Sequence, residues 1–136
     1  MTISTGGMKM YAKINELADR LTDKLVAARR DFHKYAESGW FEMRTSSLIA
    51  RRLTDMGYEV LTGPDVCLGE SRMGLPPDEE LEKNYVRAKE QGADPEFLEN
   101  VKGGFTGVMG ILRCGEGPTV ALRFDIDALG VVEDAS

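Results

Sequence analysis

The chain is poor in the side chains from which metal and nucleophile sites are usually built. Its 136 residues include one histidine, His33, and two cysteines, Cys67 and Cys114, without metal-type spacing. One imidazole and no nucleophile-elbow motif exclude a serine–histidine–aspartate triad, and two separate thiols are typical of a reduced chain rather than a disulfide scaffold. Because a hydrolytic zinc site needs about three protein ligands, these residues cannot build one alone.

Long apolar runs and a basic excess are also missing. No apolar run approaches the ~20 residues that a membrane-spanning helix needs, and residues 1–7 contain no signal-peptide core, so we expect a cytoplasmic protein without a membrane partner. The net charge of −6 argues against nucleic acid, whose binding requires a basic surface. The glycine-rich run at 103–107 lacks the lysine of a phosphate loop.

The negative charge is concentrated in one stretch. Residues 64–104 carry ten acidic and five basic side chains, whereas residues 9–57 carry seven acidic and ten basic ones. An acidic stretch of this kind is typical of a solvated surface. A charged interface with a partner is the alternative interpretation.

Apolar spacing predicts two long N-terminal helices, over 9–35 and 44–56. Apolar residues at three- and four-residue steps lie on one face of a helix. Gly57 is expected to be a left-handed C-terminal cap of the second helix, and His33 a capping or hydrogen-bonding residue near the end of the first. The predicted stripes are Ile14, Leu17, Leu21, Leu25, Ala28, Phe32 and Tyr35, and then Ile49, Leu53 and Met56.

A helical insertion and three short strands are predicted for the remainder. Residues 64–104 form the insertion, in which Pro77 precedes one helix and Asp94 caps another over about 94–101. The apolar face of the first insertion helix is Leu81, Tyr85 and Ala88. Strands are predicted over 58–61, 106–112 and 120–124, in one sheet whose last two strands can form an antiparallel hairpin. This order indicates an α/β or α+β fold.

Two carboxylates follow the last predicted strand. Asp125 and Asp127 are two residues apart, so an extended chain puts them on one side, where they repel unless a cation or Arg123 lies beside them. Strand ends are also where open α/β sheets bind ligands. A solvated loop or an ion pair to Arg123 is the plainer interpretation, and sugar-nucleotide transferases use the same spacing to hold a metal bound to diphosphate.

Several segments resemble one enzyme family, the zinc- or manganese-dependent amidohydrolases. This family includes hippurate and auxin-conjugate hydrolases and belongs with the aminoacylase and glutamate carboxypeptidase type of metallopeptidase. The segments that carry the resemblance are Arg29–Trp40, Arg44–Thr45 and Leu53–Val60. It covers nearly all of this chain but about the first third of a family member.

Three features favour the branch of the family that acts on p-aminobenzoyl-glutamate. They are Tyr35–Trp40, the Arg72–Pro76 part of the insertion and Gly103–Gly107. Most of the family has proline where Ala36 stands, and most lacks the insertion.

The resemblance implies a catalytic domain of three α/β/α layers, interrupted in the family by a lid or dimerisation domain. Two zinc or manganese ions there activate a water that attacks an amide carbonyl. Asp127 corresponds to the acid that orients a metal-bound histidine. Asp125 corresponds to a metal-binding histidine in the carboxypeptidase relatives and to Asp in the amidohydrolase branch. The family's metal ligands, a Cys-Gly-His motif, a Glu pair and further histidines, are absent from this sequence.

Residues 1–136 are thus expected to be the N-terminal part of one catalytic domain, with a mixed sheet of about three strands and without the lid. Alone, the chain is predicted to bind no metal and to be inactive; the complete enzyme is expected to hydrolyse an N-acyl amino acid such as p-aminobenzoyl-glutamate. An incomplete sheet leaves an open edge, which predicts self-association or binding to a second type of hydrolase subunit. The alternative is a stand-alone binding or assembly module that uses the acidic helical insertion and the incomplete sheet to hold a partner.

Overall fold

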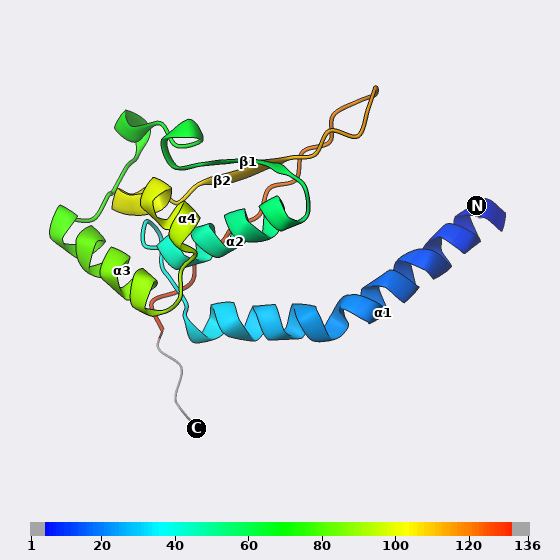
Figure 1. Cartoon of the computed structure of the whole chain (residues 1–136), viewed down its shortest axis with the longest axis horizontal. Coiled ribbons are helices and arrows are strands. Elements are labelled where there is room, and N and C mark those ends of the chain that lie inside the picture. Colours follow the sequence, from blue (N-terminus) through cyan, green and yellow to red (C-terminus); the bar gives the residue numbers. More distant parts are fainter. Residues whose placement is uncertain (1–4, 132–136) are drawn as a thin grey trace. The chain divides into compact units, whose positions relative to one another are not determined.

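A computed structural model describes residues 5–131 of the chain (Figure 1). The chain divides into two units, Met1–Tyr35 and Ala36–Ser136. Within the described part, no helix is both long and apolar enough to cross a membrane.

The first unit is the helix α1, Thr5–Lys34, which confirms the first predicted helix. A single helix cannot bury its own apolar stripe, and Ile14, Leu21 and Leu25 are exposed. His33 and Lys34 lie in its last turn, where positive charge is favourable to the helix dipole.

The described part of the second unit contains a short antiparallel sheet, three α-helices and three 3₁₀ turns. Its elements are α2 (Met43–Asp55), β1 (Glu59–Thr62), η1 (Gly63–Asp65), η2 (Gly69–Ser71), α3 (Asp78–Glu90), α4 (Pro95–Leu98), η3 (Glu99–Gly104) and β2 (Val108–Ile111). The helix α2 is central, because it contacts both strands and the helices α3 and α4. The strands pair in the register Glu59↔Ile111 to Thr62↔Val108 and lie side by side in Figure 1.

The third predicted strand, 120–124, is not formed, so the prediction of one three-stranded sheet was wrong for the described residues. The sheet there has two strands, β1 and β2, and the three layers implied by the resemblance are not seen. Val120, Leu122 and Phe124 are 80%, 77% and 75% exposed. A strand needs a neighbour for its backbone N–H and C=O groups, and β1 and β2 pair with each other instead.

The predicted insertion supplies most of the core. Leu81, Tyr85 and Ala88 of α3 are buried as predicted, and they pack with Met43, Leu98 and Val101. The interpretation of 64–104 as a solvated surface therefore applies to its outer side alone. Each buried aliphatic or aromatic side chain of this kind contributes roughly 1.5–3 kcal/mol to folding.

The buried face of α2 is largely polar, although Met43 and Ala50 are also buried, and apolar periodicity does not predict the polar part. Met56 of the predicted stripe is exposed, and the short side chains of Thr45, Ser46 and Ser47 are buried instead. Both serine hydroxyl groups have partners: Ser46 Oγ donates to the carbonyl oxygen of Thr106, and Ser47 Oγ donates to that of Arg44. A buried hydroxyl is tolerated when it is hydrogen-bonded.

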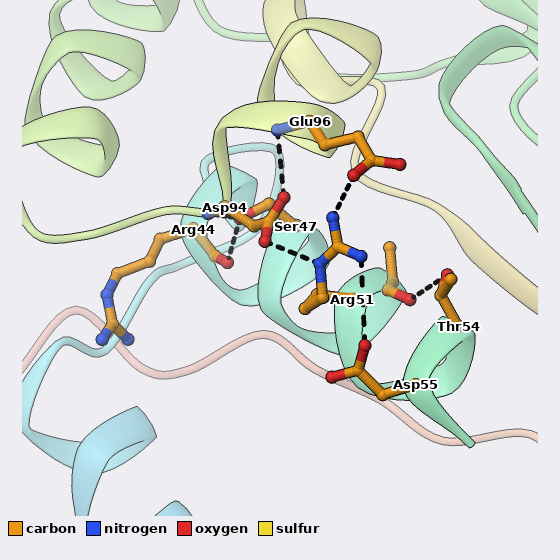
Figure 2. A network of polar contacts seen from close by, with 8 residues as sticks. Arg44, Ser47, Arg51, Thr54, Asp55, Asp94 and Glu96 are labelled. Atoms are coloured by element: carbon orange, nitrogen blue, oxygen red, sulfur yellow. Dashed lines mark hydrogen bonds and ion pairs between the residues drawn. The ribbon is translucent and has the colours of Figure 1, made fainter.

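A polar network joins α2 to α4 (Figure 2). Asp94 caps α4, as predicted, by accepting from the Glu96 N–H group at 3.0 Å. Arg51 donates to Asp94 at 2.9 Å and also to the Glu96 carboxylate. Burial by itself raises the pKa of Asp94, but the hydrogen bonds from Arg51 and from backbone N–H groups outweigh it and lower that pKa.

Candidate functional site

The two carboxylates that the sequence predicts as site residues have different surroundings. Asp125 forms an ion pair with Arg123 at 2.6 Å, and both side chains are largely exposed. Asp127 precedes Ala128, whose N–H donates to the carbonyl oxygen of Glu37 at 2.7 Å. Both aspartates are exposed, but the backbone beside Asp127 is hydrogen-bonded to the turn before α2, whereas the Asp125 side chain pairs with Arg123 of the same stretch.

Glu37 is a buried carboxylate at the beginning of α2. Its side chain accepts hydrogen bonds from the backbone N–H groups of Arg44 at 3.2 Å and Thr45 at 2.7 Å. Arg87 of α3 donates to the same carboxylate at 3.0 Å. Because the first N–H groups of a helix have no partner within the helix, a negative charge here satisfies them and is favourable to the helix dipole.

Glu42 is a second buried carboxyl, close to both Glu37 and Asp127. It occupies the N-cap position of α2 without capping it through its side chain, and it is 7% exposed. The Thr106 hydroxyl donates to it at 2.9 Å. Burial raises the pKa of Glu42, the bond from Thr106 opposes that change, and the charges of Asp127 and Glu37 add to it. In such an environment the carboxyl keeps its proton to a higher pH than an exposed glutamate does.

Sequence patterns did not identify Glu37, Glu42, Arg87 and Thr106 as members of this cluster. Glu42 and Thr106 are separated by 64 positions along the chain, so no local motif joins them. One signal was available for Glu37. The predicted second helix has no serine, threonine, aspartate or asparagine directly before it, so its first N–H groups were open to an acceptor from elsewhere in the chain or to water.

The motifs that favour the p-aminobenzoyl-glutamate branch come together beside this cluster. The Arg72 guanidinium lies 3.6 Å from the centre of the Phe105 ring and donates to the carbonyl oxygen of Gly103 at 2.6 Å. The next residue after Phe105 is Thr106, which bonds Glu42. The insertion and the glycine-rich run thus support the position of the carboxyl cluster.

The described residues do not fit a metal centre by themselves. Within residues 5–131, no three His, Cys, Asp or Glu side chains are placed to hold an ion. Cys67 is half-buried and Cys114 is exposed, and both are free thiols.

Comparison with known proteins finds similarity to hydrolases. No protein-family model matches the chain. It is 45% identical over 122 residues to indole-3-acetyl-aspartic acid hydrolase of Enterobacter agglomerans. It is 43% identical over 122 residues to one of the subunits of p-aminobenzoyl-glutamate hydrolase, the one designated A, from Escherichia coli. Each match covers 89% of this chain and 28% of the relative.

A solved structure is similar to the same degree. The crystal structure of aminobenzoyl-glutamate utilization protein from Klebsiella pneumoniae superposes with a TM-score of 0.82 and 45% sequence identity, over 85% of this chain and 30% of that one. The chain thus spans less than a third of the length of these relatives. As its motifs predict, it resembles the Escherichia coli p-aminobenzoyl-glutamate hydrolase over nearly all of its own length.

Proposed function

We propose that this chain forms part of the catalytic domain of a metal-dependent amidohydrolase that cleaves N-acyl amino acids, with p-aminobenzoyl-glutamate as the substrate. The observation that carries the proposal is the 43% and 45% identity to two hydrolases. Their named substrates share a chemistry, because each joins an acyl group that carries an aromatic ring to an acidic amino acid through an amide bond. The cleaved group is then an amide next to a dicarboxylic amino acid.

The proposed role of Asp127 is to orient a metal ligand rather than to bind a metal. Two observations support this role. The neighbouring Ala128 N–H is held by the Glu37 carbonyl, and the pKa of the nearby Glu42 responds to the charge of Asp127. An acid that orients a ligand must be held in place. The Ala128–Glu37 hydrogen bond restrains the backbone beside Asp127, and the effect on the pKa of Glu42 indicates that the two carboxyl groups are close. Asp125 forms an exposed ion pair with Arg123, and we expect its replacement to affect turnover less than replacement of Asp127.

A chimera tests the proposal. The matching segment of the Escherichia coli relative, 28% of that protein, is replaced by this chain, and release of p-aminobenzoate is measured with zinc or manganese present. We expect turnover by the chimera and none by the 136-residue chain alone. In the chimera, Asp127→Asn should lower kcat about 10- to 100-fold, and Asp125→Asn should lower it less.

The matched control is Glu116→Gln, a change of the same kind at an exposed site in the same unit. It should leave kcat unchanged. A chimera that folds and binds metal yet releases no p-aminobenzoate would contradict the proposal and would favour the alternative of a binding or assembly module.

A further inference from the structure

Glu37 contacts three separate parts of the second unit. Its carbonyl oxygen accepts from Ala128 N–H at 2.7 Å. Its carboxylate accepts from the N–H groups of Arg44 and Thr45 at the beginning of α2, and from Arg87 of α3 at 3.0 Å. The Glu37 side chain is 0% exposed in this ion pair, so these bonds are made out of water, where charged hydrogen bonds are strongest.

The stretch 119–131 has little apolar packing to hold it. Leu122, Phe124 and Leu129 are 77%, 75% and 84% exposed, so burial contributes little to its position. The Arg123–Asp125 ion pair lies within the stretch and does not attach it to another element. The bond from Ala128 to Glu37 does attach it, and it lies one residue from Asp127.

The side-chain bonds of Glu37 determine where its carbonyl oxygen lies. The carboxylate is fixed by two backbone N–H groups of α2 and by one guanidinium. Because these bonds tether the side chain, they restrict where the peptide group of the same residue can lie, and that group offers Ala128 its acceptor. The guanidinium comes from α3, so the insertion takes part in this arrangement.

We propose that Glu37 is a positioning residue that holds Asp127 beside Glu42, and that Arg87 of the insertion helix α3 keeps Glu37 in place. The importance of this for catalysis rests on the proposed function, but the positioning itself does not. A plain helix cap would stabilise α2 alone. A positioning residue also controls the backbone at Ala128, 91 positions further along the chain.

Amide hydrogen exchange of the whole 136-residue chain, followed residue by residue by NMR, separates the two roles. In Glu37→Ala we expect exchange at Ala128 to accelerate about tenfold, the equivalent of one lost backbone hydrogen bond, while the amide of Leu53 inside α2 stays protected. Glu37→Gln, which keeps an acceptor oxygen, should restore much of the protection at Ala128.

The matched control is Ser47→Ala. It also removes a buried polar contact of α2, the acceptor of the Asp94 N–H at 3.0 Å, but it does not touch Glu37. Exchange at Ala128 should be unchanged in this control. If Glu37→Ala unfolds α2, Arg87→Gln decides the question, because it leaves the two backbone caps and should still accelerate exchange at Ala128.

An Ala128 amide that is unprotected in the wild type, or that exchanges at the same rate in the variants while α2 stays folded, would overturn the proposal. No substrate or metal is needed for this experiment. Its failure would therefore leave the proposed amide hydrolysis untouched, and an inactive chimera would leave the positioning role untouched.

Discussion

At the scale of single residues, Glu42 carries the clearest pH dependence. Its pKa is raised from the ordinary 4.5, chiefly by burial, so the folded chain holds this proton more tightly than the unfolded chain does. The stabilisation is complete below the unfolded pKa and is lost as the pH rises through the raised, folded pKa. Each unit of difference corresponds to about 1.4 kcal/mol.

Glu42→Gln should remove this dependence. A glutamine oxygen can still accept from Thr106, and it does not ionise. We expect the free energy of unfolding of the variant to rise relative to the wild type between pH 4.5 and neutral pH. Urea denaturation over a pH series measures it.

Asp127→Asn serves as a second variant in this series. The charge of Asp127 raises the pKa of Glu42. Removing that charge should therefore produce part of the rise in the free energy of unfolding that we expect for Glu42→Gln. If the free energies of unfolding of the wild type and of Glu42→Gln change with pH in parallel, Glu42 ionises in the folded chain as it does in the unfolded chain.

Residue patterns drew attention to one pair of acids, whose catalytic role stays a prediction. The pair Asp125 and Asp127 was identified from its spacing at the end of a predicted strand, and the ion pair of Asp125 with Arg123 was expected from their proximity in sequence. Glu42 was missed because burial and a distant partner, Thr106, give it its properties. Neither can be read from a local motif.

At the scale of elements, two glycines with positive φ have different reasons to be glycine. Gly57 (φ +84°) ends α2 as predicted, and a Cβ there would meet no atom within 4 Å. Gly63 (φ +63°) begins η1, and a Cβ there would lie 2.0 Å from the carbonyl oxygen of Asn100. Gly57 therefore needs to be glycine because of its backbone angle alone. Gly63 needs to be glycine because of its backbone angle and because a side chain would clash with Asn100.

Replacing each by alanine should separate these effects. Gly57→Ala should cost about 1–2 kcal/mol, the strain of a left-handed L-residue. Gly63→Ala should cost about 3 kcal/mol or more, because the backbone of η3 must also move away. Thermal unfolding of both variants measures the difference, and equal losses would mean that the η1–η3 contact is loose.

Elements were predicted well where local chemistry decides them. The Asp94 cap, the Gly57 stop and the apolar face of α3 follow from short-range rules and are confirmed. The predictions failed where residues far away in the sequence determine the structure. The predicted strand at 120–124 lacks a described neighbour, and α2 buries hydroxyl groups because Thr106 and Asp94 are there to pair with them.

At the scale of the whole molecule, the stretch 119–131 leaves an apolar surface exposed. Val120, Leu122 and Phe124 alternate along it and are each at least 75% exposed. Apolar side chains in a row favour association, since each that becomes buried contributes roughly 1.5–3 kcal/mol. This surface is the reason to expect that copies of the chain associate.

Leu122→Ser combined with Phe124→Ser should weaken that association about tenfold or more. Leu68→Ser is the matched control, because Leu68 is 64% exposed and lies outside the stretch. Light scattering over a concentration series gives the masses. A wild-type chain that stays monomeric at high concentration would refute the expectation.

The pairing of β1 with β2 has a consequence for the order in which the chain folds. The two strands are neighbours in space, but Thr62 pairs with Val108, and all of α3, α4 and η3 lies between them in the sequence. Closing so long a loop is entropically costly before other contacts form. We therefore expect the helices to collapse first and the ladder to close last, so that damage to α3 would delay a sheet that it does not belong to.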